Sequence, residues 1–289
     1  MRRRLTFLIG AHKTASTHLQ RSLTAQRDAV RDAGVAIIGP MPIGGDILPL
    51  SELLRGRADP ALLSLAAEGF LDKHAGDAPE VLLLNENILG NSLAPDMALR
   101  DNQLYKFAPA RLKRVLQLFP GHDIRVGLAV RNPAGFLVSA WQENMKGHAF
   151  QPFRDYLGQT EVAQLSWLKL IKRLRQAIGE TEIFLWRYED YADVAPRVLH
   201  HAMGPAAGRI TLKQGAANPG FSAAALDFLA DNGTVTKDAS AEALRRFPKG
   251  PDNPAFQPWT EAELQAMSER YDADLQKIES RGLGQVLRP

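Results

Sequence analysis

The chain has 289 residues, of which 45% are hydrophobic and 23% are charged, and its formal net charge is +3. This composition is typical of a globular protein that can bury a sizeable core. Cysteine is absent, which excludes disulfides, thiolate metal sites and thiol nucleophiles. No apolar run approaches membrane-spanning length, and the arginine-led apolar stretch at the start ends at His12 without a small-residue cleavage site. We therefore expect a cytoplasmic protein without a signal peptide or a membrane span.

Short apolar runs alternate with longer amphipathic segments along most of the chain. Strands are predicted at residues 4–10, 35–40, 80–87, 123–133 and 181–190. Helices are predicted at residues 17–34, 47–76 with a break near Asp59-Pro60, 104–119, 135–148, 161–179, a shorter segment through Leu199, 222–231 and 260–282. Thr260 and Glu263 match a capping box at the start of the last helix.

This alternation predicts an α/β protein with a three-layer α/β/α arrangement around a central parallel sheet. The run "EVLLLNEN" supports a parallel sheet, because it is apolar on both faces like a strand buried between two helical layers. We expect one domain over residues 1–289, with a core at 5–200 and a helical C-terminal extension at 205–289.

The segment "GAHKTASTHLQ" at residues 10–20 follows the first predicted strand directly. Gly10 lets the backbone approach an anion closely, and a helix that begins near Ser16 and Thr17 directs its free amides and its dipole toward that anion. Lys13 adds a mobile positive charge, and Thr14 adds a further hydroxyl donor. These features predict a phosphate-binding loop, although a simple helix cap beside a solvated lysine has the same residues. The spacing is not that of a Walker A loop.

The end of the third predicted strand bears on metal chemistry. The strand ends in Asn85, Glu86 and Asn87, and no predicted strand ends in the aspartate that holds magnesium in many triphosphatases. The sequence therefore disfavours a metal-dependent triphosphatase, and we expect no metal.

The fourth predicted strand supplies a second polar segment, "RNPAGFLVS" at residues 131–139. Arg131 ends the strand and offers a planar fork that suits a phosphate, and Pro133 opens a helix. Ser139 lies about two turns into that helix, near the same end of the sheet. Because ligands of open parallel sheets bind beyond the carboxyl ends of the strands, this segment is predicted to face the opening loop. A surface ion pair and a tolerated helical serine are the alternative.

Taken together, the two segments resemble the cofactor-binding segments of the sulfotransferase family, which uses 3′-phosphoadenosine 5′-phosphosulfate. "HKTAST" at residues 12–17 is similar to the Lys-Thr-Gly-Thr-Thr loop that binds the 5′-phosphosulfate in that family, with Ala15 in place of glycine and Ser16 in place of threonine. "RNPAGFLVS" is similar to the Arg-x-Pro and Ser pattern that binds the 3′-phosphate. The "HLQ", "NEN" and "RYEDY" segments are also similar to bacterial members. The resemblance covers roughly residues 5–200 and implies the P-loop-type α/β/α fold.

One departure lies in the C-terminal part. The Arg-Lys-Gly and Gly-Asp-Trp-Lys motif of the cytosolic animal enzymes is missing, and "FPKGPDN" at residues 247–253 is at most a remnant of it.

The resemblance implies a metal-independent transfer of the sulfuryl group from 3′-phosphoadenosine 5′-phosphosulfate to a hydroxyl acceptor, either a small molecule or a glycan. It implies that the co-substrate is held by Gly10, Lys13, Thr14, Ala15, Ser16, Thr17, Arg131 and Ser139. Lys13 is the expected catalytic cation. Glu86 is our first choice for the base, with His12 as a catalytic candidate beside the sulfuryl group and His148 as a further candidate facing the acceptor.

Several alternatives remain open at this level. A nucleotide or phosphometabolite kinase can share the fold, and Ala15 favours a non-catalytic sulfotransferase-like binding protein. Nucleic-acid binding is disfavoured, because no basic run with interleaved aromatic residues is present. Trp141, Trp186 and Tyr188 are candidates for stacking on adenine, or else core residues. The sequence identifies neither the acceptor nor the oligomeric state.

Overall fold

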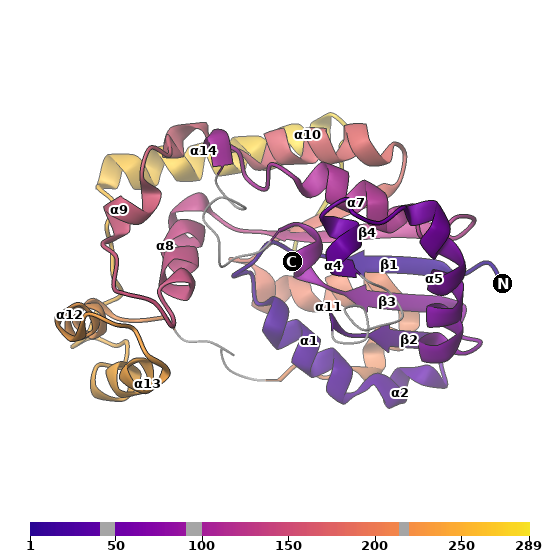
Figure 1. Cartoon of the computed structure of the whole chain (residues 1–289), viewed down its shortest axis with the longest axis horizontal. Helices are drawn as coiled ribbons and strands as arrows, with labels where there is room; N and C mark the ends of the chain where they lie inside the picture. The colour runs from indigo at the N-terminus through magenta and orange to yellow at the C-terminus, as the bar shows by residue number, and fades with distance from the viewer. Residues whose placement is uncertain (41–49, 91–99, 214–219) are drawn as a thin grey trace.

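The computed structural model describes residues 1–40, 50–90, 100–213 and 220–289. Within these ranges, six parallel strands form a sheet in the order β2-β3-β1-β4-β5-β6 (Figure 1). The strands are β1 (Arg4–Leu8), β2 (Val35–Ile38), β3 (Glu80–Leu84), β4 (Asp123–Val130), β5 (Glu182–Arg187) and β6 (Gln285–Leu287). This order places β1 and β4 side by side at the centre, although β2 and β3 lie between them in the chain.

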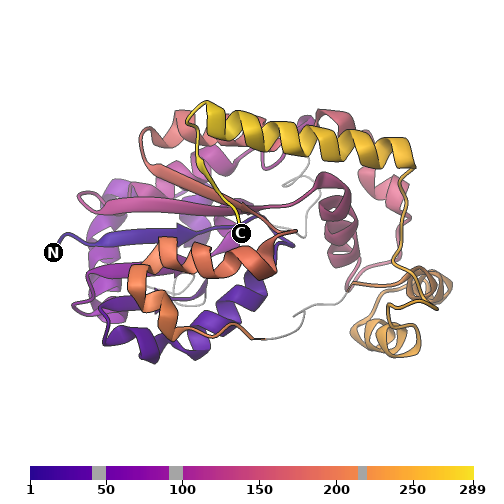
Figure 2. The same cartoon turned by 180° about the vertical axis from the view of Figure 1, so that it is seen from behind.

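The two faces of the sheet are covered by different helices. Alternate residues of β1 enter different hydrophobic cores, since Leu5 and Phe7 belong to one core and Leu8 belongs to the other. The first core includes residues of α4 (Leu50–Leu54), α5 (Pro60–Ala75), α7 (Ala108–Leu116) and α10 (Trp167–Ile178). The second includes residues of α1 (Ser16–Ala25), α2 (Arg27–Arg31) and α11 (Tyr191–Met203), and Figure 2 shows this side of the molecule. The predicted three-layer arrangement around a parallel sheet is confirmed.

Further helices lie beyond the carboxyl ends of the strands and across one face (Figure 1). They are α8 (Pro133–Asn144), α9 (Phe153–Leu157), α12 (Ala223–Asn232), α13 (Lys237–Arg246) and α14 (Glu261–Ser280). The predicted capping box of Thr260 and Glu263 begins α14, which packs against α10 and α8. The chain then returns to the sheet, where β6 pairs with β5. The helical C-terminal part is confirmed, whereas α9, α13 and β6 were not predicted.

Several helix boundaries differ from the predicted ones for local reasons. The predicted helix at 17–34 is divided into α1 and α2 at Gln26, which has a non-helical φ of −121°. The predicted helix at 161–179 begins only at Trp167, because the side chain of Ser166 caps it and donates to the buried Asp274 of α14. The predicted break at Asp59-Pro60 is confirmed, with Asp59 as the N-cap of α5. Residues 47–49 of that prediction lie outside the described residues.

Short 3₁₀ segments complete the described elements: η1 (Glu86–Ile88), η2 (Arg100–Asn102), η3 (Val162–Gln164) and η4 (Gly204–Arg209). Of the helices that the structure describes, none is both long and apolar enough to cross a membrane.

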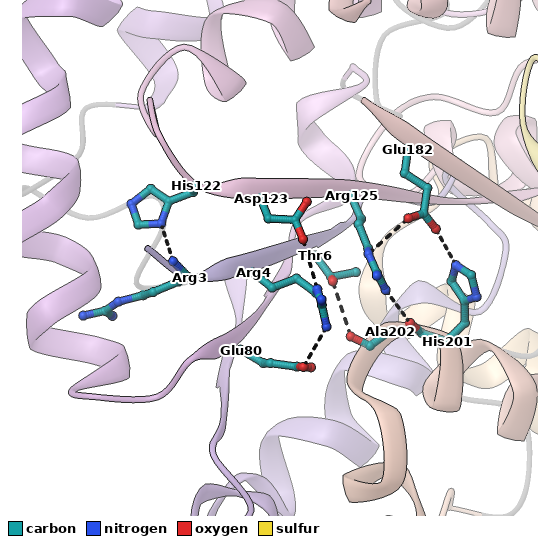
Figure 3. A network of polar contacts seen from close by, with 10 residues as sticks. All are labelled: Arg3, Arg4, Thr6, Glu80, His122, Asp123, Arg125, Glu182, His201 and Ala202. Carbon is teal, nitrogen blue, oxygen red and sulfur yellow. Dashed lines mark hydrogen bonds and ion pairs between the residues drawn. The ribbon is translucent and has the colours of Figure 1, made fainter. Parts of the chain in front are cut away.

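Ion pairs between neighbouring strands support the register at the amino end of the sheet (Figure 3). Arg4 of β1 lies opposite Glu80 of β3 on one side and Asp123 of β4 on the other. Its guanidinium contacts both carboxylates, at 3.0 Å and 3.1 Å respectively. Arg125 and Glu182 form a similar pair across β4 and β5, with an N–O distance of 3.1 Å. Opposite charges placed directly across strands favour one register, and a one-residue slip would bring none of these pairs together.

We expect Arg4→Gln to lower the free energy of unfolding by about 0.5–1 kcal/mol, because the pairs are partly exposed and screened by water. The loss should shrink in high salt, where surface charges interact less. Chemical denaturation at low and high salt measures both effects. Arg2→Gln is the matched control, since Arg2 is exposed. A loss that is equal at both salt concentrations would contradict an electrostatic role for Arg4.

Candidate functional site

The candidate site lies where the chain leaves the two central strands in opposite directions. The segment after β1 leads to α1 on one face of the sheet, and the segment after β4 leads to α8, whose apolar residues belong to the other core. This is the topological switch point at which open parallel sheets bind ligands. The pairing of β1 with β4 continues past Leu8, because the Ile9 and Ala11 amides donate to carbonyls of β4 at 3.0 Å and 2.9 Å.

Gly10 is required by this close pairing. A Cβ atom at Gly10 would lie 3.1 Å from the Cβ of Ala129 and 3.3 Å from Oγ1 of Thr14. The glycine therefore lets the opening loop begin tightly against β4, and it does not line the cavity described below.

The backbone of the opening loop has an unusual conformation. Lys13 and Ala15 have φ angles of 64° and 63°, in the left-handed region that favours glycine. Left-handed residues alternating with other conformations form the backbone nests that bind anions. Ala15 also occupies the N-cap position of α1, whose first amides have no intrahelical partner. Loop and helix start together present backbone amides in an arrangement that suits an anion.

Two side chains of the loop point inward and hold its shape. His12 is buried, its amide donates to the hydroxyl of Tyr105 at 3.0 Å, and its ring Nδ1 lies 3.0 Å from the same hydroxyl. Its Nε2 lies 3.4 Å from Oδ1 of Asn87. Burial lowers the pKa of His12, so that the neutral ring is favoured. The hydroxyl of the buried Thr14 donates to the carbonyl of Ala11.

Arg131 joins the second segment to the first. Its Nη1 donates to the carbonyl of Lys13 at 2.7 Å, and its guanidinium lies over the ring of Tyr188, 4.3 Å from the centroid. The guanidinium is thus held by a backbone oxygen and an aromatic face, and no described carboxylate lies within ion-pair distance of it. A cation in this position keeps its charge available to an anionic ligand.

The ammonium group of Lys13 has a carboxylate partner on α8. Its Nζ lies 2.7 Å from Oε2 of Glu143, and Nζ of Lys146 lies 2.9 Å from the same oxygen. Burial alone would raise the pKa of Glu143, but the hydrogen bonds from the two lysines outweigh it and lower that pKa. Glu143 is therefore ionised at neutral pH.

Glu86 begins η1, immediately after β3. Its carboxylate accepts a hydrogen bond from the side-chain amide of Gln20 on α1 and is partly buried. The residue therefore faces α1 and the opening loop from the neighbouring strand.

A cavity of about 1040 Å³ lies at the switch point. Predicted site residues from segments more than a hundred positions apart line it together: His12, Lys13, Ala15, Ser16, Thr17, Glu86, Arg131 and Ser139. Tyr188 also lines it, whereas Trp141 and Trp186 are buried in the core. Among the described residues, no group of three or more His, Cys, Asp or Glu side chains is arranged to hold a metal ion.

Lys249 is a lining residue that the sequence did not single out as part of the site. It belongs to the "FPKGPDN" segment after α13, and the partial match of that segment to the Arg-Lys-Gly motif was the available signal. Burial and the positive charge of Arg131 lower the pKa of Lys249. No described carboxylate forms an ion pair with Lys249 or with Arg131, although Glu189, which also lines the cavity, attracts Arg131 electrostatically.

Glu143 was also missed, because it lies on α8 one turn after Ser139 in a stretch without a recognisable motif. From the sequence, a glutamate in that position is expected to be an exposed helical residue. Only the tertiary structure brings the loop containing Lys13 beside it.

The solved structures to which the chain is similar include two sulfotransferases. The chain is similar to a sulfotransferase from Alicyclobacillus acidocaldarius, with 13% identity, a TM-score of 0.44, and coverage of 97% of this chain and 96% of that one. It is also similar to the sulfotransferase domain from the curacin biosynthetic pathway, with 15% identity, a TM-score of 0.39, and coverage of 93% and 97%. No protein-family model matches the sequence, and no curated protein matches it.

Ala15 offers a direct test of the loop conformation. A left-handed φ is disfavoured for alanine by about 1 kcal/mol relative to glycine. Ala15→Gly should therefore leave the free energy of unfolding unchanged or raise it by up to about 1 kcal/mol. Ala15→Val should lower it by more than about 1 kcal/mol, because a branched side chain is disfavoured there. Urea denaturation of the two variants distinguishes them. A loss of stability on Ala15→Gly would contradict this loop geometry.

Proposed function

We propose that this protein is a sulfotransferase, which moves the sulfuryl group of 3′-phosphoadenosine 5′-phosphosulfate to a hydroxyl acceptor without a metal ion. The observation that carries the proposal is the convergence of two separate sets of anion-binding groups on one cavity. The opening loop and Lys13 form one set, and Arg131, Ser139 and Lys249 form the other. A nucleoside whose ribose carries one anionic group at the 5′ position and another at the 3′ position has the charge pattern that fits both sets.

The first set suits the 5′-phosphosulfate. The free amides at the start of α1, together with the hydroxyls of Ser16 and Thr17, favour a multiply charged anion there. Lys13 supplies a cation to the same group. In this proposal Gly10 and Thr14 act by shaping the loop, since the first packs on Ala129 and the second bonds to the carbonyl of Ala11.

The second set suits the 3′-phosphate. Arg131 and Lys249 are cations without described carboxylate partners, and Ser139 adds a hydroxyl from the second turn of α8. Adenosine triphosphate has no phosphate at the 3′ position, so this set favours a nucleotide that carries one.

The reaction needs a nucleophile, a base and stabilisation of the leaving group. The oxygen of the acceptor hydroxyl attacks sulfur, the bond from sulfur to the 5′-phosphate oxygen breaks, and adenosine 3′,5′-bisphosphate leaves with the electron pair. Lys13 and the loop amides stabilise the charge that develops on the leaving phosphate, as in phosphoryl transfer. Glu86 takes the proton of the acceptor hydroxyl.

Glu86 is preferred to His12 as the base. The partners of His12, Tyr105 and Asn87, engage both of its ring nitrogens, whereas Glu86 lines the cavity with a carboxylate that has one described hydrogen-bond donor, Gln20. His148 does not line the cavity. His12 retains a role in holding the loop beside the transferring group.

The 3′-phosphate assignment is tested by a pair of nucleotides. Lys249→Met should weaken binding of adenosine 3′,5′-bisphosphate by about tenfold, the range expected for a partly buried charge-assisted contact. Binding of adenosine 5′-phosphosulfate, which lacks the 3′-phosphate, should change by less than about twofold. Calorimetric titration measures both affinities, and Lys237→Met on the exposed start of α13 is the control. Equal losses for the two nucleotides would overturn the assignment.

The reaction itself is tested by transfer of labelled sulfuryl groups from 3′-phosphoadenosine 5′-phosphosulfate to a panel of hydroxylated acceptors in the presence of EDTA. Glu86→Gln should lower the turnover by about 10²–10⁴-fold, as is typical when a general base is lost, with co-substrate affinity unchanged. The amide oxygen of the new side chain still accepts from Gln20, which preserves the pocket. Weakened nucleotide affinity with a normal maximal rate would instead assign Glu86 to the structure of the loop.

A further inference from the structure

The cavity contains a negative charge where the proposed co-substrate is itself negative. Glu143 lines the cavity on α8, and its Oε2 is shared by Nζ of Lys13 at 2.7 Å and Nζ of Lys146 at 2.9 Å. The side chains of Lys13 and Glu143 are only 17% and 27% exposed. The contact is therefore shielded from solvent, where ion pairs are stronger than on an open surface.

This arrangement sets up a competition for one ammonium group. While Lys13 is paired with Glu143, its ammonium group attracts an incoming phosphate less strongly. If Lys13 moves away from Glu143, the Glu143 carboxylate repels that phosphate. The charge of Glu143 is maintained by its lysine partners rather than removed by protonation. The carboxylate thus opposes binding of an anion beside Lys13.

Lys146 limits the cost of breaking the contact. It follows Glu143 by three positions, just after the end of α8, and its side chain is 42% exposed. Because Lys146 contacts the same oxygen as Lys13, the carboxylate keeps a cationic partner after Lys13 has turned to a ligand. The alternative, a carboxylate alone beside a phosphate, is strongly unfavourable in a shielded site.

We infer that Glu143 is a positioning residue that holds Lys13 in the nucleotide-free protein and releases it to the entering anion, while Lys146 retains the Glu143 carboxylate. The inference rests on the proposed function, because it takes Lys13 as the cation that contacts the 5′-phosphate end of the nucleotide. It adds to that function a residue pair that tunes how tightly substrate and product are held.

Substitutions of Glu143 and of Lys146 should then change the nucleotide affinity in opposite directions. Glu143→Gln removes the carboxylate that competes with the nucleotide for Lys13 and that repels the 5′-phosphate. Binding of adenosine 3′,5′-bisphosphate should therefore tighten by about threefold to tenfold. Lys146→Gln leaves Glu143 dependent on Lys13, so binding of the same nucleotide should weaken by a similar factor. Adenosine 3′-monophosphate lacks the 5′-phosphate, and its affinity should change by less than about twofold in either variant.

The experiment is a calorimetric titration of the wild-type protein and the two variants with both nucleotides in EDTA, with melting temperatures measured in parallel. Opposite shifts that are confined to the 5′-phosphorylated nucleotide support the inference. Shifts in the same direction, no shifts, or equal shifts for adenosine 3′-monophosphate overturn it and leave the proposed function standing. Failure of the wild-type protein to bind adenosine 3′,5′-bisphosphate overturns both. If Glu143→Gln does not fold, the affinity of Lys146→Gln still tests the inference: weaker binding of adenosine 3′,5′-bisphosphate supports it, and unchanged binding overturns it.

Discussion

The candidate site depends on the hydrogen bond from Arg131 to the carbonyl of Lys13, which joins segments 118 positions apart. It forms because β1 and β4 are neighbours at the switch point of the sheet. The bond fixes the position of Lys13 within a loop whose backbone is already constrained by two left-handed residues. It also orients the guanidinium, which lies over Tyr188 and faces the same cavity. Without this contact the two segments would still be joined by the pairing of β1 with β4, but neither the Lys13 carbonyl nor the guanidinium would be held in place.

The cations that line the cavity differ in whether a carboxylate is paired with them, and this difference determines how each can interact with an anionic ligand. Arg131 and Lys249 form no ion pair with a described carboxylate, so an anion beside them gains attraction without breaking an existing ion pair. Lys13 is paired with Glu143, so an anion at the loop end must compete for it. In the proposed function, the groups around Arg131 and Lys249 would anchor the nucleotide, and the pair of Lys13 and Glu143 would let it be exchanged.

Much of the fold and part of the site followed from the sequence. Apolar periodicity located five of the strands, and the polar groups at the ends of the first and fourth strands predicted that Lys13 and Arg131 line one cavity. The strand β6, with three residues, was too short to give a pattern. Glu143 and Lys249 gained their positions only through tertiary packing, because neither lies at a strand end. The left-handed φ of Ala15 could likewise not be predicted, since alanine gives no local signal for a left-handed turn.

The central claim is that the cavity recognises a nucleotide with phosphates at both the 5′ and 3′ positions and does so without a metal ion. Calorimetric titration of the wild-type protein with adenosine 3′,5′-bisphosphate in EDTA tests this most directly, with adenosine 5′-monophosphate and magnesium-ATP as comparison ligands. The account predicts saturable binding of the bisphosphate, weakened by about tenfold or more when the 3′-phosphate is missing. Binding of magnesium-ATP alone, with none of the bisphosphate, would contradict it and point to a kinase.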